Sequence, residues 1–162
     1  MFSAYLRQRA TALLALYRER GLRLVTAESC TGGLLAGLIT EIPGSSDVFE
    51  RGYVTYSNRA KVENLGVATD LIARFGAVSA EVAAAMADGA LRHAAARVAL
   101  SVTGIAGPDG GSAEKPVGLV YFGYGRAGTI ATLERRFGDI GRSDVRLASV
   151  ETALDLLLGV SG

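Results

Sequence analysis

Cysteine and histidine are almost absent from this sequence. Its 162 residues include one of each, Cys30 and His93, and no tryptophan. A single cysteine excludes an internal disulfide and a cysteine-based zinc cluster, and a single histidine excludes a metal site with several histidine ligands. We therefore expect no metal site, and the scarcity of cysteine is typical of a cytoplasmic protein.

An excess of one charge is also missing. The chain has 17 basic and 16 acidic residues, a formal net charge of +1, and no block of lysine or arginine. Because nucleic-acid binding relies on a basic excess that neutralises phosphates, nucleic acid is not an expected partner. An anion that binds here is expected to be small.

Long hydrophobic runs are missing as well. The longest run without a charge spans residues 29–40, which is 12 residues, whereas a helix needs about 20 to cross a bilayer. The first ten residues already carry Arg7 and lack the apolar core of a secretory leader. We expect no membrane segment, and with 49% hydrophobic residues we expect residues 1–162 to form one compact domain.

Hydrophobic periodicity predicts an alternation of helices and strands. Helices are expected up to Gly21, after Cys30 up to Pro43, from Asn58 as a capping residue, from Ser79 as a capping residue to about Ala96, and over 143–158 with Leu147 on the buried face. Strands are expected at 22–29, 47–57, 96–104, 117–125 and 128–137. This order predicts an α/β sandwich with a mostly parallel sheet and one antiparallel hairpin, and ligands of such sheets bind at the carboxyl ends of the strands.

The first strand meets its helix at Ser29-Cys30-Thr31-Gly32-Gly33. Free N–H groups and the positive end of the helix dipole converge at such a junction, so an oxyanion is stabilised beside a Ser29 or Cys30 nucleophile. The alternative is an N-capping serine followed by glycines that let the helix pack closely. For Cys30 we favour a small buried thiol, since no histidine lies nearby in sequence to lower its pKa.

Lysine is rare, because only Lys61 and Lys115 accompany 15 arginines. A desolvated lysine can accept a proton near neutral pH, whereas arginine cannot. Lys61 follows the second strand, and a parallel neighbouring strand would bring it beside Ser29, so a Ser-Lys pair for acyl transfer is one interpretation. The other is a solvated surface lysine. His93 lies mid-helix, far from a strand end, and Glu28 is expected to point to the face opposite Ser29.

Two further segments are candidates for binding a phosphate or ribose. The loop SVTGIAGPDGG presents backbone and hydroxyl donors after the third strand, while Asp109 in it is interpreted as a turn former. Arg142 and Arg146 are four residues apart and are expected to share a helix face, where they either clamp an anion or are solvated.

Four ordered motifs resemble one known family. These are TAESCTGG, PGSSDVFERGYVTYSNRAKVENLGV, GAVSAEVAAAMADGA and SVTGIAGPDGGSAEKPVG, and together with the segments between them they extend over residues 6–158. They resemble the CinA C-terminal-domain family of nicotinamide-nucleotide amidohydrolases (NMN deamidases). The resemblance implies a three-layer α/β/α sandwich with a mixed sheet, and hydrolysis of the carboxamide of nicotinamide mononucleotide to nicotinic acid mononucleotide and ammonia, in pyridine nucleotide recycling, without metal or organic cofactor.

The resemblance also implies site residues. Ser29 corresponds to the nucleophile, Lys61 to its partner, and Tyr56 to a tyrosine close by. Substrate contacts are expected from Cys30, Thr31, Gly32, Gly33, Asn58, Thr103, Gly104, Ala106, Gly107, Arg142 and Arg146. The N–H groups of the Cys30–Gly33 turn are expected to hold the oxyanion. The family forms oligomers, so we expect a dimer or a larger homo-oligomer.

The chain departs from the family's pattern before its final helix. It reads GDIGRSDVR, so two extra residues separate the two arginines from Gly138-Asp139, and their contacts to phosphate need a structural test. Two alternatives to the amidohydrolase stay open. One is a non-catalytic nucleotide-binding or regulatory module related to competence- or damage-inducible proteins, and the other is a hydrolase of the same mechanism that acts on a different amide.

Overall fold

A five-stranded mixed sheet forms the centre of the computed structural model, which describes residues 2–160. The strands are β1 (Leu24–Glu28), β2 (Phe49–Val54), β3 (Val98–Gly104), β4 (Leu119–Arg126) and β5 (Thr129–Arg136), in the order β2-β1-β3-β4-β5. β1 pairs in parallel with both β2 and β3, whereas β3 with β4 and β4 with β5 pair antiparallel. The predicted sheet with an antiparallel hairpin is confirmed.

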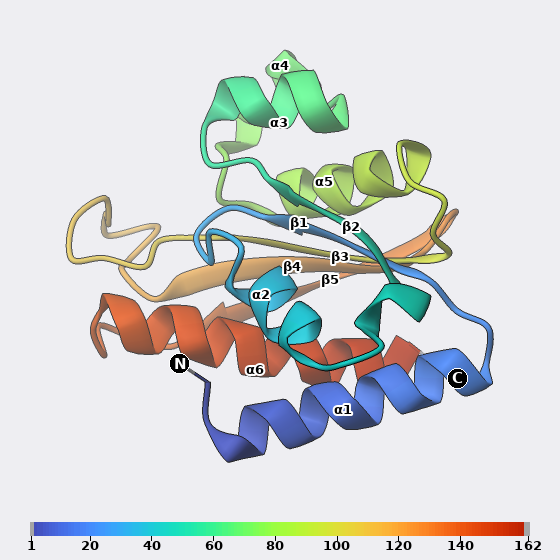
Figure 1. Cartoon of the computed structure of the whole chain (residues 1–162). Helices are drawn as coiled ribbons and strands as arrows, with labels where there is room; N and C mark the ends of the chain where they lie inside the picture. The colour runs from blue at the N-terminus through green and yellow to red at the C-terminus, as the bar shows by residue number, and fades with distance from the viewer. Residues whose placement is uncertain (1, 161–162) are drawn as a thin grey trace.

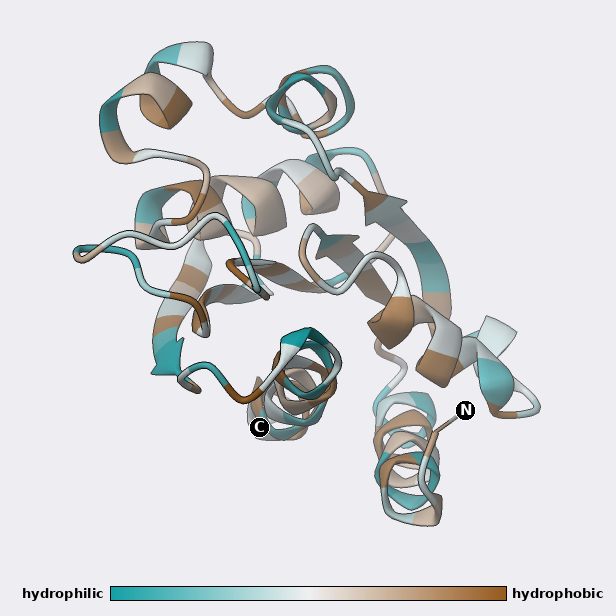
Figure 2. Ribbon diagram, turned by 90° about the vertical axis from the view of Figure 1, so that its left-hand side faces the viewer, coloured by the Kyte–Doolittle hydropathy of each residue, from teal (hydrophilic) through white to brown (hydrophobic). Residues whose placement is uncertain are grey.

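Helices cover both faces of this sheet. One layer contains α1 (Ala4–Glu19), α2 (Leu34–Glu41) and α6 (Arg142–Val160), and the other contains α3 (Asn58–Leu65), α4 (Thr69–Phe75) and α5 (Ala80–Arg92) (Figure 1). The view turned by 90° shows the sheet between the two layers (Figure 2). A short 3-10 turn, η1 (Ser45–Asp47), leads from α2 to β2. The α/β/α sandwich is therefore confirmed.

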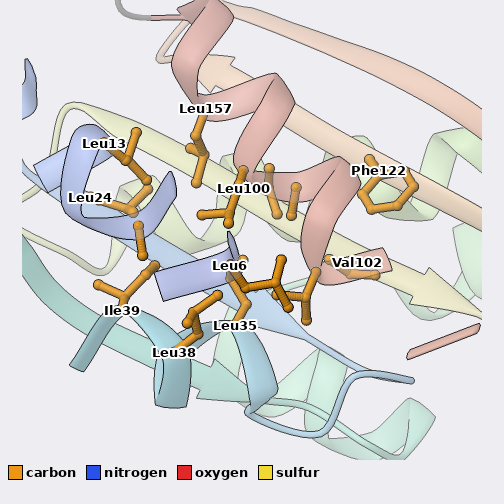
Figure 3. Packing of buried hydrophobic residues seen from close by; sticks show 14 of the residues in the cluster. Leu6, Leu13, Leu24, Leu35, Leu38, Ile39, Leu100, Val102, Phe122 and Leu157 are labelled. Atoms are coloured by element: carbon orange, nitrogen blue, oxygen red, sulfur yellow. The ribbon is translucent and has the colours of Figure 1, made fainter. Parts of the chain in front are cut away.

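The alternation of side chains along the strands creates two hydrophobic cores. Leu24 of β1 faces α1, α2 and α6, while its neighbour Val25 faces α5. Figure 3 shows the larger core, in which leucines of α1 and α2 meet Leu100 of β3, Phe122 of β4 and Leu157 of α6. β1 and β3 are buried on both faces, as expected for strands that are covered by helices on each side, so their sequences do not alternate regularly between apolar and polar residues.

Two glycines allow α5 to lie close to its neighbours. A Cβ atom at Gly123 of β4 would lie 2.3 Å from the carbonyl oxygen of Ala83, and one at Gly89 would lie 2.0 Å from the carbonyl oxygen of Leu65. Side chains at these positions would push α5 away from the sheet and from α3. The close packing of α5 depends on both glycines.

Several sequence expectations need correction. Ser57, not Asn58, caps α3, because its Oγ accepts the N–H of Ala60 at 3.1 Å. α5 ends at Arg92 rather than near Ala96, and the sequence did not predict α4. The expectation that Leu147 lies on the buried face of the last helix is wrong, because this side chain is 36% exposed. The buried positions of α6 follow 145, 149, 150, 153, 154 and 157, so position 147 lies off this stripe. No helix among residues 2–160 is both long and apolar enough to cross a bilayer.

Candidate active site

Ser29 and Lys61 meet at the carboxyl ends of β1 and β2. Ser29 follows the last residue of β1, and Lys61 lies in the first turn of α3, which starts shortly after β2. Lys61 Nζ lies 3.0 Å from Ser29 Oγ and donates to the carbonyl oxygen of Thr55 at 2.8 Å. Lys61 is 1% exposed. The interpretation of Lys61 as a solvated surface lysine is therefore wrong.

Burial changes the acid–base properties of this lysine. Loss of hydration lowers the pKa of Lys61 from its usual value. A lower pKa increases the fraction of neutral amine, whose lone pair can accept a proton from Ser29. The pair therefore has the geometry and the electrostatics of an activated nucleophile.

Cys30 has the opposite character. Burial is the main cause that raises the pKa of its thiol to about 12, so the thiolate is scarce at neutral pH. The thiol also belongs to the larger hydrophobic core. The structure supports the expectation of a buried packing cysteine rather than a nucleophile.

Glu28 binds the start of α2, a role that the sequence analysis missed. Its carboxylate is fully buried and accepts the N–H groups of Gly33 and Leu35 at 3.1 Å and of Ala36 at 2.9 Å. α2 has no capping side chain at its first turn, so Glu28 replaces one from the preceding strand. The only signal in the sequence was a helix start with two glycines and no acidic cap.

The turn therefore offers fewer free donors than expected. The N–H of Gly32 donates to the carbonyl oxygen of Ser29, and the N–H of Gly33 donates to Glu28. Neither is free for an oxyanion, which corrects the expectation for these two glycines. Within residues 2–160, the N–H groups of Cys30 and Thr31 donate to no protein oxygen, but Thr31 is fully buried, so only the N–H of Cys30 remains available to a ligand.

A cavity of about 260 Å³ opens at the Ser29–Lys61 pair. It is lined by Ser29, Cys30, Tyr56, Asn58, Lys61, Ala77, Val78, Thr103, Gly104, Ala106 and Arg142. The structure thus brings together most of the predicted site residues. The wall at 77 and 78, from the connection between α4 and α5, was not predicted, because small apolar residues in a loop carry no chemical signal.

Arg142 spans the mouth of this cavity. It donates to Tyr56 Oη at 2.7 Å and to the carbonyl oxygen of Gly107 at 2.8 Å. Tyr56 is 60% exposed, and its hydroxyl bonds Arg142 rather than Lys61. Gly107 is held through its carbonyl and does not line the cavity. Arg142 therefore joins three segments that surround the opening.

Arg146 has a different position from Arg142. It donates to the carbonyl oxygens of Cys30 at 3.1 Å and Thr31 at 3.0 Å, and it does not line the cavity. Arg146 thus holds the turn that follows Ser29, and it does not join Arg142 to form the expected clamp of two arginines on one anion. Thr31, Gly32 and Gly33 also lie outside the lining.

Thr103 lies at the end of β3, in the wall of the cavity. The Thr103 hydroxyl donates to the carbonyl oxygen of Ala77 at 2.8 Å, so it ties the end of β3 to the cavity wall. Within residues 2–160, no three histidine, cysteine or acidic side chains are grouped so that they could hold a metal ion. The chemistry that the arrangement itself supports is attack by Ser29 on a small acyl group.

Comparison with known proteins places this site in a family. A family model described as the CinA C-terminal domain matches residues 6–160. The chain is 53% identical over 146 residues to the nicotinamide-nucleotide amidohydrolase PncC of Enterobacter agglomerans, covering 86% of this chain and 88% of that protein.

Other relatives are longer or are known as structures. A CinA-like protein of Geobacter sulfurreducens is 54% identical over 148 residues, and the chain spans 35% of its length. The crystal structure of the competence/damage inducible protein CihA from Agrobacterium tumefaciens matches with a TM-score of 0.97 and 50% identity, covering 100% of this chain and 99% of that one. The family match over nearly the whole chain and the PncC relative agree that this chain belongs to the CinA C-terminal domain family.

Proposed function

We propose that this chain is a nicotinamide-nucleotide amidohydrolase that converts nicotinamide mononucleotide into nicotinic acid mononucleotide and ammonia, in pyridine nucleotide recycling. The observation that carries the proposal is the buried Lys61 amine 3.0 Å from Ser29 Oγ, inside a cavity. The 53% identity to a protein named for this activity supports the substrate.

In the proposed mechanism, neutral Lys61 takes the proton of Ser29 while Oγ attacks the carboxamide carbon. The N–H of Cys30, which lines the cavity, stabilises the negative charge that develops on the carboxamide oxygen. Lys61 then gives its proton to the leaving nitrogen, so that ammonia departs and an acyl-enzyme remains. Lys61 then takes a proton from water as the water oxygen attacks the acyl carbon, and it returns this proton to Ser29 Oγ as the bond between Oγ and the acyl carbon breaks, which releases the carboxylic acid and restores Ser29 and neutral Lys61.

The size of the cavity suggests which part of the substrate lies inside it. At about 260 Å³ the cavity is smaller than the common range of ligand sites, which starts near 300 Å³, so we expect it to hold the pyridine carboxamide. The ribose and phosphate then extend to the mouth, where Arg142 and Asn58 lie. Arg142 uses only part of its five N–H donors for Tyr56 and Gly107, so donors remain for a phosphate. Backbone groups of Gly104 and Ala106 complete the proposed substrate site.

Ammonia release from nicotinamide mononucleotide, measured with chelator present, tests this proposal. We expect turnover in the unmodified protein, none in Ser29→Ala, and normal turnover in the matched control Ser46→Ala, an exposed serine of η1. Turnover that survives in Ser29→Ala would remove Ser29 as the nucleophile. Binding of the nucleotide without ammonia release would favour the non-catalytic nucleotide-binding module.

A panel of other carboxamides separates this substrate from a different amide. Faster release from another amide than from nicotinamide mononucleotide would keep the mechanism and change the substrate.

We also propose that the protein is cytoplasmic and forms a homo-oligomer of two or more copies. Size-exclusion chromatography with light scattering measures the assembly.

A further inference from the structure

Two threonines on neighbouring strands carry buried hydroxyl groups without a partner. Thr26 lies in β1, Thr55 directly follows β2, and both side chains are fully buried. Within residues 2–160, neither Oγ1 atom has a hydrogen-bond partner. A buried hydroxyl without a partner costs free energy, so its presence beside an active site points to a role in the reaction.

Thr55 is the neighbour of Ser29 across the two strands. β1 and β2 pair in parallel up to their last residues, so the next pair in this register is Ser29 and Thr55. The N–H of Thr55 still donates to the carbonyl oxygen of Glu28 at 2.8 Å. A continuing parallel ladder would pair the Thr55 carbonyl oxygen with the N–H of Cys30, but Lys61 Nζ donates to this oxygen instead, at 2.8 Å. The amine therefore lies where the two strands separate.

The Thr55 hydroxyl and the Lys61 amine lie on the same face of the sheet. Tyr53, two residues before Thr55, packs against the smaller core, which contains Leu65 of α3. Because side chains alternate along a strand, Thr55 points to this face as well, and Lys61 lies four residues before Leu65 on the same side of α3. Covalent geometry keeps the hydroxyl oxygen of a threonine within about 5 Å of its own carbonyl oxygen, which here contacts Nζ. Rotation about one side-chain bond of Thr55 therefore brings its hydroxyl to the amine.

The ammonium form of Lys61 has one N–H donor more than it has acceptors. Of its three donors, one binds the Thr55 carbonyl oxygen, and a second faces Ser29 Oγ at 3.0 Å, where the proton is taken up and passed to the leaving nitrogen. Within the described part of the chain, no atom accepts the third N–H, and a side chain that is 1% exposed cannot turn it to bulk water. A donor and an acceptor, both buried and both unpartnered, thus lie on one face of the sheet.

No carboxylate competes for this donor. The titratable groups that line the cavity together with Lys61 are Cys30, Tyr56 and Arg142. Glu28 lies on the opposite face of β1, where it binds the start of α2. Burial lowers the pKa of Lys61, and within residues 2–160 Cys30 is the only group that counteracts this effect.

We propose that Thr55 is a positioning residue of the amidohydrolase, whose hydroxyl accepts the third N–H of Lys61 while Lys61 carries the proton taken from Ser29. This inference rests on the proposed function. Thr55 does not line the cavity, so it acts on the reaction only through Lys61. Its hydrogen bond stabilises the ammonium form and the transition states in which positive charge develops on Lys61.

Replacement by valine, which has the shape of threonine without the hydroxyl, tests the proposal. In Thr55→Val we expect kcat for ammonia release to fall about tenfold with an unchanged KM, because the charged amine loses a hydrogen bond. The rise of kcat/KM with pH should move about one pH unit lower, because the ammonium form is less stable. Thr55→Ser, which keeps the hydroxyl, should restore both values.

The matched control is Thr26→Val. It removes a hydroxyl that is equally buried and unpartnered but lies on the opposite face of the sheet. A Cβ atom at Gly52 would lie 2.9 Å from Thr26 Oγ1 and 3.2 Å from the Cβ of Ala36, so Thr26 points to α2 and away from Lys61. We expect Thr26→Val to leave kcat and the pH profile unchanged.

The pKa of Lys61 is also measurable without substrate. The chain has only two lysines, Lys61 and Lys115, so lysine labelled with carbon-13 at Cε gives two NMR signals, and Lys115→Met assigns them. We expect Lys61 to titrate about one pH unit lower in Thr55→Val than in the unmodified protein, and at the same pH in Thr26→Val.

Several results would overturn the proposal. An unchanged titration of Lys61 in Thr55→Val would do so, as would an equal loss of kcat in Thr26→Val. A raised KM with unchanged kcat in Thr55→Val would assign Thr55 a structural role in the cavity wall instead. If the unmodified protein releases no ammonia, the proposed function fails, whereas the NMR titration still decides whether Thr55 binds the ammonium group. Thermal unfolding followed by circular dichroism confirms that each variant is folded.

Discussion

Replacing Lys61 by Met separates the chemical role of this residue from its structural role. Met has a similar length and fits a site that is 1% exposed, but it lacks the amine that contacts Ser29 Oγ and the Thr55 carbonyl oxygen. A buried carbonyl left without a donor costs about 1–3 kcal/mol, and part of this is offset because no amine has to be desolvated. In a chain of this size each kcal/mol lowers Tm by about 2–4 °C, so the variant stays folded at 25 °C.

The effect on turnover is expected to be much larger. A general base contributes about 10²–10⁴-fold to rate, so we expect kcat for ammonia release to fall by that factor in Lys61→Met. The matched control is Lys115→Met, because Lys115 also donates to two backbone carbonyls, of Phe75 at 2.6 Å and Val78 at 2.8 Å, but does not contact Ser29. Since Val78 lines the cavity, this control is expected to raise KM while kcat changes little. A Lys61→Met variant that keeps more than about a tenth of kcat would refute the base assignment.

Three further predictions concern pH and packing. Because burial lowers the pKa of Lys61, kcat/KM should rise with pH as the folded lysine loses its proton, at pH values below its usual pKa of 10.5. The free energy of unfolding should also rise with pH between the lowered pKa and 10.5, because the unfolded chain still holds the proton that folded Lys61 has lost. pH–rate profiles measure the first effect, and urea titrations at several pH values measure the second. Glu28→Ala should lower the free energy of unfolding by about 3 kcal/mol or more in urea titrations, since three N–H groups lose a charged acceptor. Gly89→Ala should lower Tm because its Cβ would meet the Leu65 carbonyl at 2.0 Å, whereas Gly159→Ala, where nothing lies within 4 Å, should stabilise α6 by about 0.5–1 kcal/mol; an unchanged Tm in Gly89→Ala would contradict the packing argument.

The sequence predicts the layers of the fold and the proximity of Ser29 to Lys61, because both follow from the order and the direction of the strands. Apolar strands that alternate with amphipathic helices leave few arrangements other than a covered sheet. Neighbouring parallel strands end at the same edge, so Ser29 and Lys61 could be placed together before their distance was known. The seven residues of α4 were missed because so short a helix carries little periodic signal.

The parts of the site that could not be predicted depend on contacts between distant segments. Glu28 is adjacent to Ser29 in sequence, but its binding to the start of α2 depends on how the strand turns into the helix. Arg142 and Arg146 lie four residues apart on α6 but bind different partners. Arg142 donates to Tyr56 Oη, whereas Arg146 donates to the carbonyl oxygen of Cys30. The four-residue spacing predicts that two side chains lie on the same side of a helix, but it does not predict which atoms of other segments they contact.

The single thiol of the chain, Cys30, lies next to Ser29, so its chemical modification can report local opening of this turn. Cys30 is buried, and the pKa of its thiol is raised to about 12, so we expect a thiol reagent to modify it slowly in the closed structure and faster when local opening exposes the turn. The labelling rate therefore measures how often the residues around Cys30 open locally, compared with how often the whole chain unfolds. No second cysteine competes for the reagent, so native-state labelling can be followed in the unmodified sequence, with and without bound nucleotide.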